Sequence, residues 1–89
     1  MTKIRLYTER KCMRKLRELV SDTFDCFTII EATGYWKRKK EKSVIFEIVL
    51  EPYHTMERQI NDLCKKICAL NEQESVLVTY EAVMGEFND

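Results

Sequence analysis

The chain has 89 residues, of which 45% are hydrophobic, and a formal net charge of zero. That length predicts a single domain over residues 1–89, and the apolar content argues against wholesale disorder. The charge is unevenly divided: residues 1–42 contain 12 Lys and Arg against 6 Asp and Glu, whereas residues 43–89 contain 3 against 9. This division indicates either a basic binding surface or attraction between subunits.

No apolar run approaches the roughly 18 residues that span a membrane. The N-terminal residues enter a strand pattern at once and contain no hydrophobic signal core. We therefore expect a cytoplasmic protein with no membrane partner, in which the four cysteines are reduced thiols.

The first two expected elements differ in the period of their apolar residues. Lys3–Thr8 alternates, which predicts a strand, and Arg10–Phe24 has helical spacing. The apolar stripe of that helix is Cys12, Met13, Leu16, Leu19, Val20 and Phe24. Thr8 or Glu9 is expected to cap its N-terminus.

A long hairpin is expected next. Phe27–Trp36 and Ser43–Glu51 are rich in β-branched and aromatic residues, and the charged segment Lys37–Lys42 joins them. Pro52 ends the second of these strands, because proline has no N–H to give to a ladder. The hairpin tip is therefore expected to be strongly basic.

Helical spacing returns over Thr55–Asn71, and Ser75–Val83 is a final strand. The order βαββαβ predicts an α+β, ferredoxin-like sandwich: a four-stranded antiparallel sheet with two helices on one face. Right-handed crossovers make the first and third strands central. The candidates for the uncovered face are Tyr7, Ile30, Ala32, Ile45, Val49, Leu77 and Thr79. A half-apolar open face on so small a domain favours a homo-oligomer.

The basic hairpin is the main candidate site. Five cations lie within Lys37–Lys42, directly after two aromatic residues. Lys and Arg hold phosphate and an aromatic ring stacks on a base, so this combination predicts a small anionic, nucleotide-like ligand. The alternative is a solvated turn whose lysines prevent edge pairing. The candidate ligand-binding residues here are Tyr35, Trp36, Lys37, Arg38 and Lys40.

Arg10 and Arg14 lie close to one face of the first predicted helix. They are candidates for a second wall of the anion site, which a neighbouring subunit would complete. The alternative is an ordinary solvent face or a docking surface for the acidic second half, since surface ion pairs are common and weak.

Neither metal binding nor catalysis is expected. Cys64 and Cys68 share a helical face and His54 precedes them, but no second knuckle completes a zinc site, so buried, inert thiols are expected. With a single histidine, no G-x-S-x-G and no phosphate-binding glycine loop, we expect no enzyme activity, no catalytic residue and no cofactor. Zero net charge argues against nucleic acid as a partner.

Five segments resemble a family of short bacterial and phage proteins that is grouped as a domain of unknown function. They are Tyr7–Glu9, Glu31–Lys37, Glu41–Val44, Gln73–Thr79 and Gly85–Phe87. In general architecture only, the chain is also similar to the nitrogen-regulatory PII proteins, which bind nucleotides in clefts between the subunits of a trimer; their signature loops are missing here.

The phage side of this resemblance implies a specific hypothesis. The protein would be an oligomeric sponge that sequesters a nucleotide immune signal without cleaving it, and so serves immune evasion. The alternative is a protein–protein interaction module without a small-molecule ligand.

Overall fold

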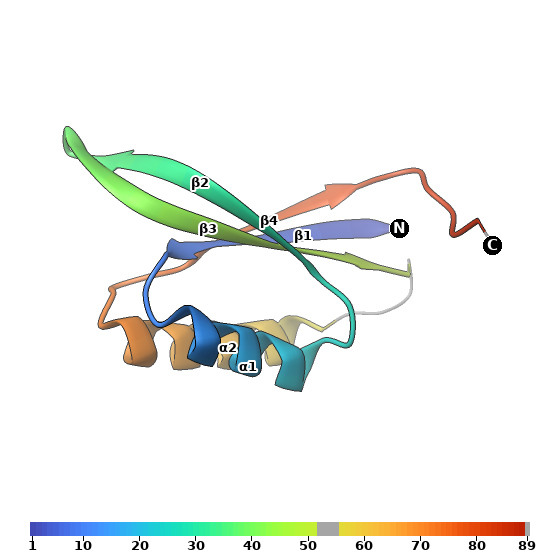
Figure 1. The fold of residues 1–89 in the computed structure, drawn as a ribbon. Coiled ribbons are helices and arrows are strands. Elements are labelled where there is room, and N and C mark those ends of the chain that lie inside the picture. The colour runs from blue at the N-terminus through green and yellow to red at the C-terminus, as the bar shows by residue number, and fades with distance from the viewer. Residues whose placement is uncertain (52–55, 89) are drawn as a thin grey trace.

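The computed structural model describes residues 1–51 and 56–88. The elements are β1 (Thr2–Glu9), α1 (Met13–Thr23), β2 (Thr28–Trp36), β3 (Lys39–Leu50), α2 (Glu57–Asn71) and β4 (Leu77–Ala82). The strands form one antiparallel sheet in the order β2-β3-β1-β4, and both helices lie against the same face (Figure 1). The ferredoxin-like prediction is confirmed, including the central positions of β1 and β3.

One cluster of apolar side chains fills the space between the sheet and the helices. Leu6 pairs with Phe46 in the register of β1 and β3, and both are fully buried. The cluster consists of Ile4, Leu6, Leu16, Val20, Phe24, Val44, Phe46, Ile48, Ile60, Leu63 and Ile67. Burial of one such side chain stabilises the fold by about 1.5–3 kcal/mol, so this cluster holds the two layers together.

Helix α1 begins at Met13 rather than at Arg10. The Arg10 N–H still donates to a β3 carbonyl at 3.0 Å, and Cys12 then adopts a left-handed conformation with φ 49°. Cys12 is exposed and occupies the N-cap position without a side-chain hydrogen bond, so its place in the buried stripe was wrongly predicted. The capping role predicted for Thr8 or Glu9 is also wrong, because both residues belong to β1.

The β2–β3 hairpin is longer than predicted, because β3 begins at Lys39 rather than at Ser43. The ladder extends to the pair Trp36 and Lys39, which leaves Lys37 and Arg38 as the turn. Their φ angles of 49° and 67° are typical of the type I′ turn, whose twist matches that of the flanking strands. The hairpin projects past the rest of the sheet (Figure 1).

The opposite end of the sheet carries both chain ends. The Val83 N–H donates to the Met1 carbonyl at 2.9 Å, and the Met1 ammonium donates to the Val83 carbonyl at 3.2 Å. Strand β4 is shorter than the predicted Ser75–Val83. The predictions for Pro52, His54 and the Thr55 helix start lie outside the described residues. Over residues 1–51 and 56–88, neither helix has the length and apolar character that a membrane span requires.

Candidate functional site

An open cleft of about 590 Å³ lies where the part of the β2–β3 hairpin next to its turn faces the end of β1 and the α2–β4 connection. All three segments are at the end of the sheet from which the hairpin projects (Figure 1). Small-molecule sites have volumes of about 300–1,000 Å³, so the cleft is large enough for a ligand of nucleotide size. We refer to this space as the cleft.

The hairpin side of the cleft is aromatic. Tyr35 and Trp36 line it and are 72% and 64% exposed. As neighbours in β2 they point to opposite faces of the strand, and Trp36 shares its face with Gly34. Gly34 comes just before them, and a Cβ there would lie 2.9 Å from the Ser43 Oγ. The absence of a side chain at Gly34 therefore allows the Ser43 hydroxyl to approach the strand beside the two rings.

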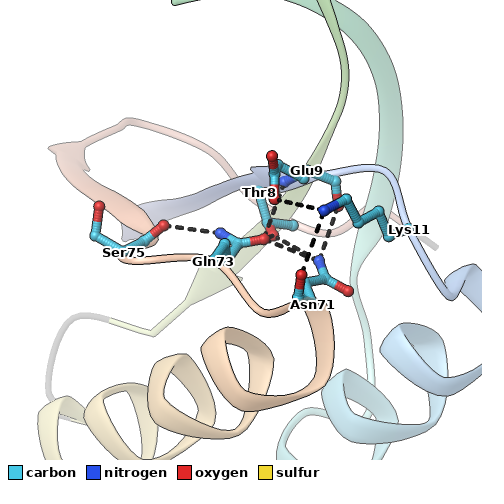
Figure 2. Close-up of polar contacts among 6 residues, drawn as sticks. All are labelled: Thr8, Glu9, Lys11, Asn71, Gln73 and Ser75. Carbon is cyan, nitrogen blue, oxygen red and sulfur yellow. Dashed lines mark hydrogen bonds and ion pairs between the residues drawn. The ribbon is translucent and has the colours of Figure 1, made fainter.

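The opposite wall is held by a hydrogen-bond network around Gln73 (Figure 2). The Gln73 Oε1 accepts from the Thr8 hydroxyl at 2.7 Å, the Asn71 Nδ2 at 2.9 Å and the Glu9 N–H at 3.3 Å. The Asn71 Nδ2 also donates to the Glu9 carbonyl at 3.0 Å, and the Gln73 Nε2 donates to the Ser75 carbonyl at 2.7 Å. These bonds fix the α2–β4 connection to the end of β1.

The end of α2 directs this connection towards the cleft. Glu72 has a left-handed backbone with φ 54°, and the Gln73 N–H donates to the Cys68 carbonyl at 3.1 Å. This arrangement is typical of helix C-termini, where Gly or Asn is the usual residue. After the reversal, Glu72 and Glu74 are among the residues that line the cleft.

The cationic residues of the hairpin lie outside the cleft. Lys37, Arg38 and Lys40 are exposed and do not line it, whereas Tyr35 and Trp36 do. The Lys37 Nζ lies 5.8 Å from the centroid of the Trp36 ring, within the range of a cation–π interaction. The hairpin thus presents aromatic rings to the cleft and positive charge beside it.

The two arginines proposed for a second wall do not reach the cleft of their own chain. The Arg10 Nη1 lies 3.0 Å from the Glu31 carboxylate. Arg14 is exposed on α1, with its Nε 3.6 Å from the Glu18 carboxylate. Neither guanidinium is therefore part of the cleft lining in this chain.

Sequence reasoning missed the polar lining of the cleft, which includes Glu41, Gln73 and Glu74. The sequence did contain a signal for these residues. Every residue that lines the cleft, except Lys11 and Glu72, belongs to one of four segments on which the family resemblance is based. These segments are far apart in the chain and meet only in the folded structure.

The cysteines lie away from the cleft lining. Cys64 and Cys68 are half-buried on α2, whereas Cys12 and Cys26 are exposed. Burial raises the pKa of the Cys64 thiol, and the neighbouring Cys68 raises it further, so Cys64 is less readily ionised than an ordinary cysteine. Over the described ranges, no group of three or more His, Cys, Asp and Glu side chains is placed to hold a metal ion.

Comparison with known proteins gives fold likeness only. No family model and no curated protein matches the sequence. Among solved structures, a phage SAM lyase in its apo state matches with a TM-score of 0.64 and 17% identity, over 90% of this chain and 78% of that one. CPII, a PII-like protein from Thiomonas intermedia K12 bound to ADP, AMP and bicarbonate, matches with a TM-score of 0.63 and 13% identity, over 98% and 94%.

The de novo designed protein Foldit4 also matches, with a TM-score of 0.52 and 17% identity, over 93% of this chain and 96% of that one. The chain therefore has a PII-like architecture. A fold shared by a lyase, a nucleotide-bound regulatory protein and a designed protein does not by itself assign a function.

Proposed function

We propose that this protein is a non-enzymatic, oligomeric binding protein that captures a small anionic, nucleotide-like ligand in the cleft. The observation that carries this proposal is the position of Tyr35 and Trp36, which line a concave junction with largely uncovered rings. Stacking of a base on an aromatic ring contributes about 1–3 kcal/mol. The Trp36 ring beside a cleft of about 590 Å³ provides a site for the base.

The anionic part of the ligand would be held at the hairpin. Lys37 and Arg38 form the turn, and Lys40 pairs with Tyr35 across the ladder. Their charged groups can reach a phosphate on a base that stacks on the neighbouring rings. Arg10 or Arg14 would contribute from an adjacent copy.

The solved structures of similar fold support the choice of ligand. One is bound to ADP and AMP, and another acts on SAM. All three compounds contain an adenosine group, so an adenine nucleotide or a related signal is the first class of ligand to test. A cytoplasmic sponge that sequesters a nucleotide immune signal would use the same site without cleaving the ligand.

A second copy would cover the open face of the sheet. Tyr7 pairs with both Ile45 and Leu77 on this face, and Val49 and Leu77 are 40% and 59% exposed. Apolar surface of this kind marks contact sites in soluble proteins. A neighbouring copy would also enclose more of the ligand, since small-molecule sites bury about 70–90% of it.

A thermal-shift panel of AMP, ADP, S-adenosylmethionine and cyclic dinucleotides tests the proposal. We expect at least one to raise the Tm, and Trp36→Ala to abolish that rise. Phe87→Ala, which removes an exposed aromatic ring from the tail, is the matched control and should respond as the wild type does. Mass spectrometry should recover the ligand unchanged. Conversion of the ligand would identify an enzyme instead, and no stabilisation by any anion would contradict ligand capture.

A protein-interaction module is the second candidate function. It is favoured by the exposed apolar side chains of β4 and the tail, namely Leu77, Tyr80, Met84 and Phe87. A pull-down that recovers a stoichiometric protein partner would test this function. If the double variant Lys37→Glu with Arg38→Glu still binds that partner, the result would support it, because the basic turn would not be needed for the interaction.

A further inference from the structure

The cleft and the hairpin tip carry charges of opposite sign. Among the described residues, four glutamates line the cleft, Glu9, Glu41, Glu72 and Glu74, together with one cation, Lys11. The Lys11 ammonium is already engaged, because it lies 3.4 Å from the Glu9 carboxylate and 3.4 Å from a carbonyl oxygen at the end of α2. The ion pairs found among residues 1–51 and 56–88 do not include Glu41, Glu72 or Glu74.

This arrangement determines which charge the cleft can accept. An anion between Glu41 and Glu74 would face carboxylates on both walls, whereas a cation there would be attracted by them. Trp36 adds a ring face, which also attracts positive charge. The Lys37 ammonium, 5.8 Å from the Trp36 centroid, is an existing example of that attraction.

We infer that the cleft receives a positively charged organic group of the ligand, such as an ammonium, while any phosphate stays at the basic hairpin tip. This inference rests on the proposed function and narrows its ligand to a nucleotide-like molecule whose two ends differ in charge. Acidic side chains alone would not carry it. What carries it is their place in the same cavity as the exposed Trp36, which belongs to the same hairpin as Glu41 and lies across the cleft from Glu74.

Three probes that share a base and ribose separate the effects of charge at the 5′ position. They are adenosine, which is neutral, 5′-amino-5′-deoxyadenosine, which is cationic, and AMP, which is anionic. Trp36 is the only tryptophan, so its fluorescence reports binding to the full chain directly. We expect the amino compound to bind about fivefold more tightly than adenosine at low salt, the size of an exposed cation–π and ion-pair contribution. The difference should shrink as salt screens the carboxylates.

The double variant Glu41→Gln with Glu74→Gln keeps the shape of both side chains and removes their charge. It should lose the preference for the amino compound over adenosine. Glu86→Gln, the same change in the tail, is the control and should keep that preference. A Lys37→Ala variant should weaken the binding of AMP more than the binding of the amino compound.

The outcomes distinguish the inference from the proposed function. Equal affinity for adenosine and the amino compound, or a preference that survives the double variant, overturns the inference while nucleotide capture stands. Binding of the amino compound but not of AMP supports the cationic cleft and contradicts an anionic ligand. If none of the three probes binds, both the capture proposal and the inference fail.

Discussion

Asn71 is the residue on which the polar wall of the cleft depends most. Its side chain is 3% exposed, and its Nδ2 faces three acceptors: the Thr8 hydroxyl at 3.3 Å, the Glu9 carbonyl and the Gln73 Oε1. Asn71→Asp would replace the donating Nδ2 with a carboxylate oxygen, which would face the same three acceptor oxygens and could not donate to them. We expect a loss of about 3 kcal/mol in the free energy of unfolding, because a buried charge loses its hydrogen bonds.

Urea denaturation measures the effect of Asn71→Asp directly. Asn61→Asp makes the same chemical change at an exposed position of the same helix, and it should cost less than about 0.5 kcal/mol. Similar losses for the two variants would show that the network around Gln73 does not hold the wall.

The ionisation of two other side chains makes the free energy of unfolding depend on pH in the alkaline range. Burial raises the pKa of Cys64 and of Tyr80 above their ordinary values of 9.0 and 10.0, and nearby negative charge adds to both shifts. The unfolded chain therefore loses these protons at lower pH than the folded one. Their contribution is complete below about pH 9 and is lost as the pH rises through the folded values. Melting temperatures from pH 7 to 11 should fall above pH 9, and Cys64→Ala should reduce that fall, whereas Cys26→Ala at an exposed position should not.

At the scale of elements, the hairpin turn is strained. Lys37 and Arg38 both have positive φ, a conformation that costs an ordinary L-residue about 1–2 kcal/mol and that Asn-Gly adopts readily. We therefore expect Lys37→Asn with Arg38→Gly to raise the free energy of unfolding by about 1 kcal/mol in urea titration. The same change removes two proposed phosphate-binding cations, so AMP affinity should fall while stability rises. A loss of stability would mean that these side chains make contacts that the turn requires.

The helices and strands could be predicted where the spacing of apolar residues along the sequence shows directly which side chains are buried. Leu16 and Val20 in α1, and Ile60 and Ile67 in α2, follow the helical stripe and are buried in the core. Cys12 fits the same spacing, but its left-handed backbone carries it out of the stripe. The period of apolar residues reports which way side chains point within a helix or strand, but it does not report where the backbone turns. The sequence therefore predicted the elements but not the residues at which they begin and end.

The cleft was predictable only on its aromatic side. Tyr35 and Trp36 are neighbours in sequence next to a charged segment, and that local pattern indicated a site. The facing wall depends on contacts such as the bond from Thr8 to Gln73, which joins positions 65 residues apart. No local pattern reports such a distance, so the acidic character of the lining emerged only from the folded arrangement.

Across the whole molecule, the two ends of the sheet have different roles. One end carries the hairpin and the cleft, whereas the other carries the paired residues Met1 and Val83 (Figure 1). Between them the open face presents apolar side chains around the ion pair of Arg5 and Glu47, whose atoms lie 2.9 Å apart. A contact between copies over this face would leave the hairpin tip accessible to a ligand.

Val49 provides a test of that contact away from the cleft. It is 40% exposed on the open face and pairs with Lys3, which also forms an ion pair with Glu81. Val49→Glu would place a second carboxylate beside Lys3, so the isolated chain should change in stability by less than about 0.5 kcal/mol. Between two copies, however, the same carboxylate would be buried beside a Lys3 ammonium that already pairs with Glu81, so its charge would not be fully compensated and the association should weaken strongly.

Light scattering coupled to size-exclusion chromatography should therefore find an oligomer for the wild type and a monomer for Val49→Glu. Ala69→Glu introduces the same charge at an exposed position on α2, in the helix layer, and should leave the oligomer intact. If the control dissociates and Val49→Glu does not, the copies meet through their helices. The open face of the sheet would then be a solvated surface, and the cleft would have to enclose its ligand within one chain.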